Sequence, residues 1–158
     1  MKVPILNESH LDATTVGVLV DFAASRCEYS DMAYVHVRTK DRRAASASDG
    51  RAFLKDPTGY GDDFLTPSRI EVDLVDRRKH RKGFPHATRH PEVPKAVGWV
   101  TIFSPEEEFL FIVAHEFQHI SDFWNHTKLT PVQLEARAEK KALKVLRAFR
   151  LLVERAAA

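Results

Sequence analysis

The sequence has almost no cysteine, since Cys27 is the only one in 158 residues. A single cysteine cannot form a disulfide within the chain, and it cannot by itself build a thiolate metal site. Any metal ion must therefore be held by histidine and carboxylate side chains. We expect Cys27 to be a buried residue that behaves as a small apolar side chain.

Long hydrophobic runs are also missing. No segment is long enough to span a bilayer, and the N-terminal MKVPILNESH has too short an apolar run to serve as a signal peptide. We therefore expect a soluble, cytoplasmic protein with no membrane partner. Because 44% of the residues are hydrophobic and no internal repeat occurs, residues 1–158 are predicted to form one domain with its own core.

A large net charge is absent as well, since the formal value is +2 at pH 7. Positive charge is concentrated in residues 76–95, which contain seven Lys or Arg and two acids. The basic side chains that form a candidate nucleic-acid contact are Arg77, Arg78, Lys79, Arg81 and Lys82. A solvated loop is the simpler interpretation of this Pro-rich segment. The spacing of His80, His86 and His90 is unspecific for a metal site.

The first part of the chain shows helical periodicity. The apolar residues that recur at helical spacing are Leu11, Val18, Leu19 and Phe22. This pattern predicts a helix over residues 10–27, and Ser9 followed by Asp12 resembles a capping box at its start.

Three later segments predict strands. Residues 33–37 and 70–74 alternate apolar with polar side chains, as half-buried strands do. Residues 96–103 are apolar on both faces, which is typical of a more central strand. The polar stretch 41–68 is interpreted as a long loop or an irregular hairpin, and the basic stretch 76–96 as a loop.

Two helix start signals mark the last third of the chain. The segment SPEE at residues 104–107 supplies an N-cap serine, a proline at the first helical position and a glutamate for a capping box. The apolar stripe of this helix consists of Leu110, Val113, Phe117, Ile120 and Trp124. The segment TPVQ at residues 130–133 repeats the signal and predicts a helix over residues 131–155, after a short loop at 125–129. Helices packed on a small sheet give an α+β fold.

The first of these helices contains the sequence HEFQH at residues 115–119. His115 and His119 are four residues apart, so both imidazoles lie on one helix face and can bind the same ion. Zinc accepts neutral histidine nitrogen, and a hydrolytic site leaves one position for water, which Glu116 can activate as a general base. The apolar run 109–114 anchors these side chains in the core, where they would be costly without a metal. We therefore predict one zinc ion per chain.

A third ligand must come from another segment, and Glu135 is the candidate. It is in phase with the core-facing stripe of the second helix, which consists of Ala138, Ala142, Val145, Phe149 and Leu152. A carboxylate at the start of such a stripe needs a compensating charge, which a zinc ion would supply. Glu139, one turn later, could accept a hydrogen bond from a ligand histidine and fix its orientation.

Alternatives for these positions stay open. Glu135 could be a first-turn acid favoured by the helix dipole. Asp122 and His126 continue the stripe of the two histidines and could each supply the third ligand. His126 could instead assist catalysis by donating to an oxyanion.

The sequence HExxH at residues 115–119, followed 16 residues later by ExxAExxA at residues 135–142, resembles the gluzincin branch of the zincin metallopeptidases. The match covers roughly residues 100–146. In that family the two histidines and the downstream glutamate bind zinc, the motif glutamate is the catalytic base, and an acid four residues later supports a histidine. That last acid is more often Asp or Asn, so Glu139 departs from the usual pattern. A metzincin is disfavoured because its glycine and third histidine would fall at Asp122 and Asn125.

The resemblance also implies a fold and a substrate. The implied fold is zincin-like, with an N-terminal helix, a small twisted and mostly antiparallel sheet, the HExxH helix and a C-terminal helix. A peptide or protein substrate would add as a strand to the edge of the sheet above the active helix. Residues 69–75 are the candidate edge strand.

Two functions from different classes follow. The first is a zinc-dependent peptidase that hydrolyses peptide bonds with Glu116 as general base. The second is a non-catalytic nucleic-acid or protein binding module that retains a zincin-like fold and uses the basic residues 77–82.

Overall fold

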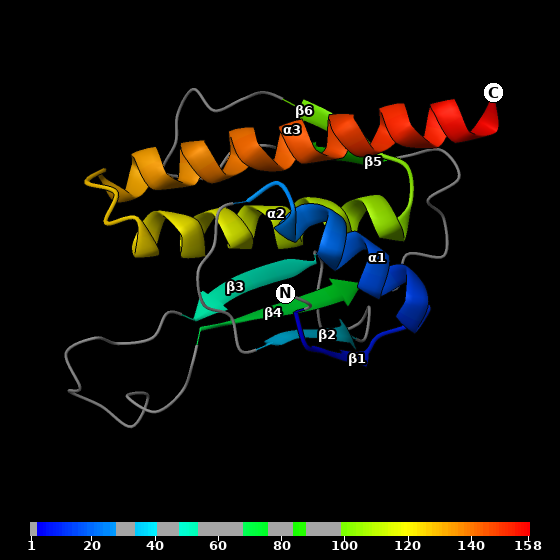
Figure 1. Cartoon of the computed structure of the whole chain (residues 1–158), viewed down its shortest axis with the longest axis horizontal. Helices are drawn as coiled ribbons and strands as arrows, with labels where there is room; N and C mark the ends of the chain where they lie inside the picture. The colour runs from blue at the N-terminus through cyan, green and yellow to red at the C-terminus, as the bar shows by residue number, and fades with distance from the viewer. Residues whose placement is uncertain (1–2, 28–33, 41–47, 54–67, 76–83, 88–98) are drawn as a thin grey trace.

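A computed structural model describes residues 3–27, 34–40, 48–53, 68–75, 84–87 and 99–158 of the chain. Over these residues the protein forms three helices and two sheets (Figure 1). In chain order the elements are β1 (Ile5–Glu8), α1 (Ala13–Ala24), β2 (Tyr34–Lys40), β3 (Asp49–Phe53), β4 (Arg69–Val75), β5 (Phe84–Ala87), β6 (Trp99–Ile102), α2 (Pro105–Trp124) and α3 (Pro131–Ala157). The predicted α+β class is confirmed.

The larger sheet has four strands in the order β1-β2-β4-β3. β1 and β4 each pair with β2 in parallel, whereas β3 runs antiparallel to β4. The prediction of a mostly antiparallel sheet is therefore wrong. Two of its three strand pairings are parallel: the two predicted strands β2 and β4 pair in parallel, and β1, a four-residue strand that was not predicted from the sequence, adds a second parallel pairing. Helix α1 connects β1 to β2, and such a crossover lets both strands run in the same direction.

β3 is an edge strand of the larger sheet, and it forms the edge that lies next to α2 (Figure 1). β4 lies between β2 and β3, so the prediction that residues 69–75 form the exposed edge is wrong. β3 lies within residues 41–68, for which a long loop or an irregular hairpin was predicted; the loop interpretation is wrong for this strand, and its antiparallel pairing with β4 is the arrangement that a hairpin has. Its sequence DGRAF is poor in strand-forming residues, so pairing with β4 rather than local propensity makes it a strand.

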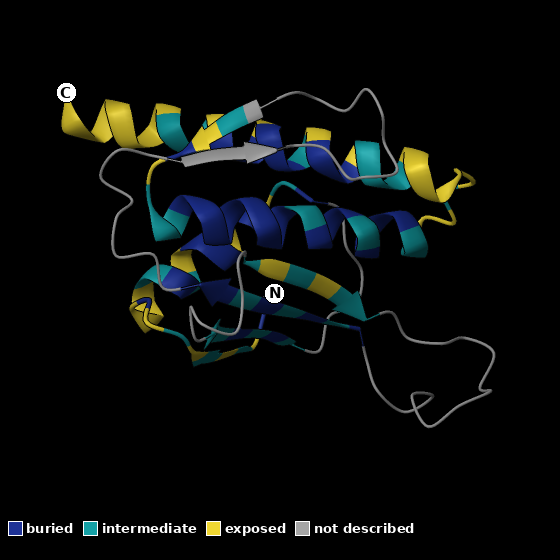
Figure 2. Ribbon diagram, turned by 180° about the vertical axis from the view of Figure 1, so that it is seen from behind, coloured by how far each residue is buried: buried dark blue, intermediate teal, exposed yellow. Residues whose placement is uncertain are grey.

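The two faces of the larger sheet differ in polarity. The buried side chains of β2 and β4 that face the helices are Val35, Val37, Ile70, Val72 and Leu74. On the other face Arg38 pairs with Asp73 at 2.8 Å, and Lys40 pairs with the same carboxylate at 2.9 Å. The predicted alternation of both strands is thus confirmed, and the helices cover one face of the sheet (Figure 2).

The second sheet is the antiparallel pair of β5 and β6. The prediction that residues 96–103 form a central strand is wrong, because β6 pairs with β5 alone among the described strands. β5 lies within residues 76–96, which were interpreted as a loop. The apolar character of β6 has another cause, since Ile102 is buried in the main core. The basic residues 77–82 lie outside the described residues.

Helix α1 is shorter than predicted and starts differently. Its N-cap is Asp12, whose carboxylate accepts a hydrogen bond from the backbone N–H of Thr15 at 2.8 Å. Ser9 instead donates to the side chain of Asn7 at 2.6 Å. Just beyond the helix, Cys27 is 5% exposed, and burial raises the pKa of its thiol to about 11. The expectation of a buried cysteine is confirmed.

Both predicted helix starts of the last third are confirmed, but at α2 the Glu107 side chain accepts from the backbone N–H of Phe103 instead of that of Ser104, so the predicted capping box does not form there. Ser104 caps α2 by accepting a hydrogen bond from the backbone N–H of Glu107 at 3.2 Å. Thr130 and Gln133 form a complete capping box at the start of α3. Among the described helices, none combines the length and the apolar character that crossing a membrane requires.

Helix α2 lies between the larger sheet and α3, and the two long helices run in opposite directions (Figure 1). The predicted stripe is buried at Leu110, Val113, Phe117 and Ile120. Buried residues occur around almost the whole circumference of α2 (Figure 2). The larger sheet and α3 pack against opposite sides of α2 and fix its position. The polar side chains of α2 are therefore held in a rigid environment.

An ion pair joins the second half of α3 to the start of α2. Arg150 donates from Nε and Nη2 to the carboxylate of Glu107, each at 2.8 Å, and also to the carbonyl oxygen of Thr101 in β6 at 2.6 Å. The backbone N–H of Phe103 donates to the same carboxylate at 2.8 Å. Burial alone would raise the pKa of Glu107, but Arg150 and the Phe103 amide outweigh burial and lower it.

Replacing Arg150 with Met should lower the free energy of unfolding at pH 7 by about 1–3 kcal/mol, because the buried Glu107 carboxylate loses its charged donor. This stabilisation is complete above the ordinary pKa of glutamate, about 4.3, and is lost as the pH falls through the lower pKa of folded Glu107. Urea unfolding should show a difference between the two proteins that shrinks below about pH 4. Arg147→Met, at an exposed position on the same helix, is the control. A difference that does not change with pH would contradict this account.

Candidate metal centre

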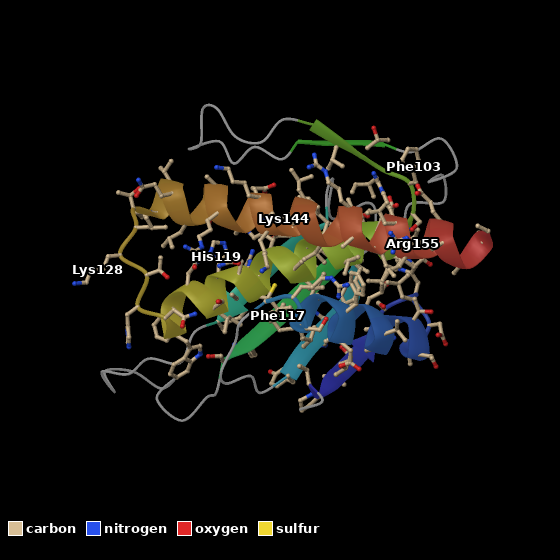
Figure 3. All side chains as sticks on the ribbon, turned by 45° about the horizontal axis from the view of Figure 1, so that its top comes forward. Phe103, Phe117, His119, Lys128, Lys144 and Arg155 are labelled. Atoms are coloured by element: carbon tan, nitrogen blue, oxygen red, sulfur yellow. The ribbon has the colours of Figure 1, made fainter. Side chains whose placement is uncertain are left out.

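Two histidines of α2 converge on one point at the interface with α3. His115 and His119 lie one helical turn apart, and their Nε2 atoms are separated by 3.0 Å. Their ring centroids lie 4.8 Å apart, with the ring planes inclined by 71°. Figure 3 shows His119 on the side of α2 that faces α3. The structure thus brings the two predicted histidines together.

Glu135, near the start of α3, directs its carboxylate at both histidines. Its Oε2 lies 3.3 Å from His115 Nε2, and its Oε1 lies 3.3 Å from His119 Nε2. The capping box of Thr130 and Gln133 fixes the first turn of α3 and therefore the position of Glu135. The predicted third ligand thus comes from the antiparallel helix, as the core-facing stripe indicated.

The spacing of these atoms fits a zinc ion. His115, His119 and Glu135 are the group of side chains that could hold a metal among the residues that the structure describes, with ligand atoms within 4.8 Å of one another. In a tetrahedral zinc site with bonds of about 2.0–2.1 Å, the ligand atoms are about 3.3 Å apart. The two Nε2 atoms are 3.0 Å apart, and each lies 3.3 Å from a different oxygen of Glu135, so each single contact is close to that value. Two imidazoles and one carboxylate are also a donor set that catalytic zinc uses.

The electrostatics of the centre favour positive charge. Burial would lower the pKa of His115, but the carboxylates of Glu135, Glu116 and Glu139 outweigh burial and raise it. Hydrogen bonds with His115 and His119 hold the pKa of Glu135 far below its ordinary value. A cation placed where the two Nε2 atoms meet would be stabilised by the same carboxylates.

Glu139, one turn after Glu135, contacts the other nitrogen of His115. Its Oε1 lies 3.5 Å from His115 Nδ1, and the residue is 8% exposed. A carboxylate at Nδ1 favours the tautomer that has its proton there and leaves the Nε2 lone pair for a metal. The structure therefore places Glu139 where the predicted supporting role requires it.

Glu116 lies on a different side of α2, against β3. The residue is 7% exposed, and burial raises the pKa of its carboxyl group despite the opposing effect of His115 and His119. The backbone N–H of Ala52 in β3 donates a hydrogen bond to this carboxylate. A buried carboxyl group with a raised pKa can take up and release a proton closer to neutral pH than an exposed one.

The contribution of β3 to the site was not predicted from the sequence. Gly50 and Ala52 of this strand approach Glu116, and neither was considered as a site residue. One feature could have indicated them. A glycine inside a strand marks a close approach of another group to the backbone, but residues 49–53 were not recognised as a strand.

Asp122 and His126, the alternative third ligands, do not belong to the metal-binding group of the described residues. Asp122 is 3% exposed, and its Oδ1 accepts a hydrogen bond from Gln118 at 2.9 Å and pairs with Arg137 of α3 at 3.0 Å. It is therefore a link between the two helices. His126 follows α2 with a left-handed backbone (φ 49°), and its role as an oxyanion donor stays a prediction.

A cavity of about 900 Å³ borders the metal centre. β3 lines it with residues 49–53, and α2 and the start of α3 line the rest. Its apolar lining includes Phe53, Phe111, Phe123, Trp124 and Leu134, and its polar lining includes His126. The cavity thus combines aromatic and aliphatic walls with many polar groups, among them the two histidines, Glu116 and Glu135, and concave sites of this size bind ligands.

The protein should bind one equivalent of zinc, measured by elemental analysis after dialysis. Glu139→Ala should keep that stoichiometry and lower the affinity by about 10- to 100-fold, because His115 loses the group that orients it. Glu135→Ala should lower the affinity further, since a ligand is removed. Glu154→Ala, at an exposed position of α3, is the control. Unaltered zinc affinity in Glu135→Ala would exclude that residue as a ligand.

Comparison with known proteins gives no family for this chain. No protein-family model, no curated protein and no solved structure matches it. The resemblance to gluzincins therefore depends on the residues between 115 and 142 and on their geometry.

Proposed function

We propose that the protein is a zinc-dependent peptidase with a zincin-like active site. One observation carries the proposal: His115, His119 and Glu135 meet at 3.0 to 3.3 Å, beside a buried glutamate that directly follows the first histidine. Two imidazoles and a carboxylate suit zinc with one open position, and the adjacent Glu116 suits proton transfer at that position. Together they form the set of groups that hydrolysis by activated water requires.

Each residue has a separate task in the proposed reaction. His115, His119 and Glu135 hold the zinc ion, which supplies the Lewis acidity that activates water and polarises a carbonyl group. Glu116 takes a proton from the attacking water and returns it to the leaving amine when the peptide bond breaks. The raised pKa of Glu116 suits it to hold that proton between the two steps. Glu139 keeps His115 in the tautomer that binds through Nε2.

The proposed substrate is a peptide in an extended conformation. β3 is hydrogen-bonded to β4 on one side and lines the cavity with the other. A peptide that adds as a strand along this edge would meet its backbone carbonyl groups, since the N–H groups of Gly50 and Ala52 already donate to Asp49 and Glu116. A peptide along β3 would pass the histidines and Glu116, which line the same cavity. His126, also in the lining, is the proposed donor to the oxyanion.

The alternative function, a non-catalytic module that binds nucleic acid or protein, depends on the basic residues 77–82. These residues lie outside the part of the chain that the structure describes. Such a module also gives no role to a buried Glu116 beside two histidines, so we prefer the peptidase.

The test is the variant Glu116→Gln, which keeps the shape of the side chain but cannot take up a proton. Cleavage of a pool of quenched-fluorescence peptides should fall by roughly 10²- to 10⁴-fold. Bound zinc, measured in the same samples, should stay at the wild-type level. A chelator should abolish cleavage by the wild-type protein, and added zinc should restore it. Unchanged cleavage by zinc-loaded Glu116→Gln would overturn the proposal.

A further inference from the structure

Gly50 and Ala52 lie on the face of β3 that α2 covers. In the pairing with β4, Gly50 is opposite Val72 and Ala52 is opposite Ile70, and both partners are fully buried on the helix side of the sheet. Side chains alternate along a strand, so residues 50 and 52 face α2. These two positions have the smallest side chains in β3.

Gly50 leaves room that Glu116 occupies. A Cβ atom at position 50 would lie 2.9 Å from Oε1 and 3.1 Å from Cγ of Glu116, and it would also collide with Cγ2 of Ile112. Contacts this short force one partner to move. With any other residue at position 50, the Glu116 side chain, Ile112 or β3 itself would have to move.

The backbone of β3 also holds Glu116. The N–H of Ala52 donates to its carboxylate, and the N–H of Gly50 donates to the side chain of Asp49 at 3.0 Å. Backbone groups two residues apart point to the same side of a strand, so both N–H groups lie at the open edge of β3. Of these two donors, only the Ala52 amide binds the proposed base.

We propose that Gly50 and the Ala52 amide form a seat that fixes the position of the Glu116 carboxylate, which makes β3 a positioning element for the catalytic base. This inference rests on the proposed function, since it assigns Gly50 and Ala52 through Glu116. The seat matters because the base must reach a proton at hydrogen-bond distance, and a small displacement of a catalytic group lowers the rate steeply. The strand that lines the substrate cavity thereby also aligns the base.

The kinetic test compares two glycine variants. Gly50→Ala should lower kcat for the peptide pool by roughly 10- to 100-fold, with little change in KM and with zinc retained. Gly17→Ala is the matched control, because its added Cβ meets nothing within 4 Å and should leave kcat unchanged. In a Glu116→Gln background, Gly50→Ala should lower the residual rate no further, since it acts through the base. If Gly50→Ala lowered the rate of Glu116→Gln as much as it lowers that of the wild-type protein, the proposal that Gly50 acts through Glu116 would be wrong.

A second test needs neither catalysis nor a folded Gly50 variant. In the zinc-free protein, Glu116→Ala should speed hydrogen exchange of the Ala52 amide by about tenfold, because its acceptor is gone. Glu116→Gln, which keeps an acceptor oxygen, should restore most of the protection. The Gly50 amide, which binds Asp49, should be unaffected and is the internal control. Equal exchange of the Ala52 amide in all three proteins would contradict the inference.

The two proposals can fail separately. If Glu116→Gln stays active, the peptidase mechanism is wrong. If Glu116→Gln is inactive but zinc-loaded Gly50→Ala keeps its kcat, the mechanism stands and the seat is wrong.

Discussion

The structure depends on the burial of α2 between the larger sheet and α3. In a helix that is enclosed on both sides, most buried polar side chains need a partner from the helix itself or from a neighbouring element. Because of the helical period, His115 and His119 face α3, whereas Glu116 faces β3. The consecutive residues of one motif are thus divided between two neighbours, which separates the metal ligands from the proposed base.

Each neighbour supplies the matching polar group. On the α3 side, the carboxylates of Glu135 and Glu139 meet the two ends of the His115 ring. On the β3 side, the Ala52 amide meets the Glu116 carboxylate. Three carboxyl groups lie around two imidazoles in this half-buried site, and a divalent cation placed there would be stabilised by them. The packing of α2 therefore supports the proposed zinc ion as well as the proposed chemistry.

The two long helices and the close approach of His115 to His119 could be predicted from sequence because their signals are local. Ser104 and Thr130 cap helices within a few residues, and the histidine spacing is a property of one helix. The strands β1 and β3 could not be predicted, since they are short and pairing with distant partners defines them. Without these two strands, the sheet was predicted to be mostly antiparallel and residues 69–75 were predicted to form its edge. The proposed role of Gly50 could not be predicted for the same reason, because this role depends on the contact between β3 and α2.

The central claim is that one zinc ion is bound by two histidines of α2 and a glutamate of α3. X-ray absorption at the zinc edge of the zinc-loaded protein tests this most directly, because it reports the ligands themselves. The account predicts a shell of four light atoms at about 2.0–2.1 Å with the outer-shell scattering of two imidazoles. A shell of six oxygens, or a spectrum without imidazole scattering, would contradict it.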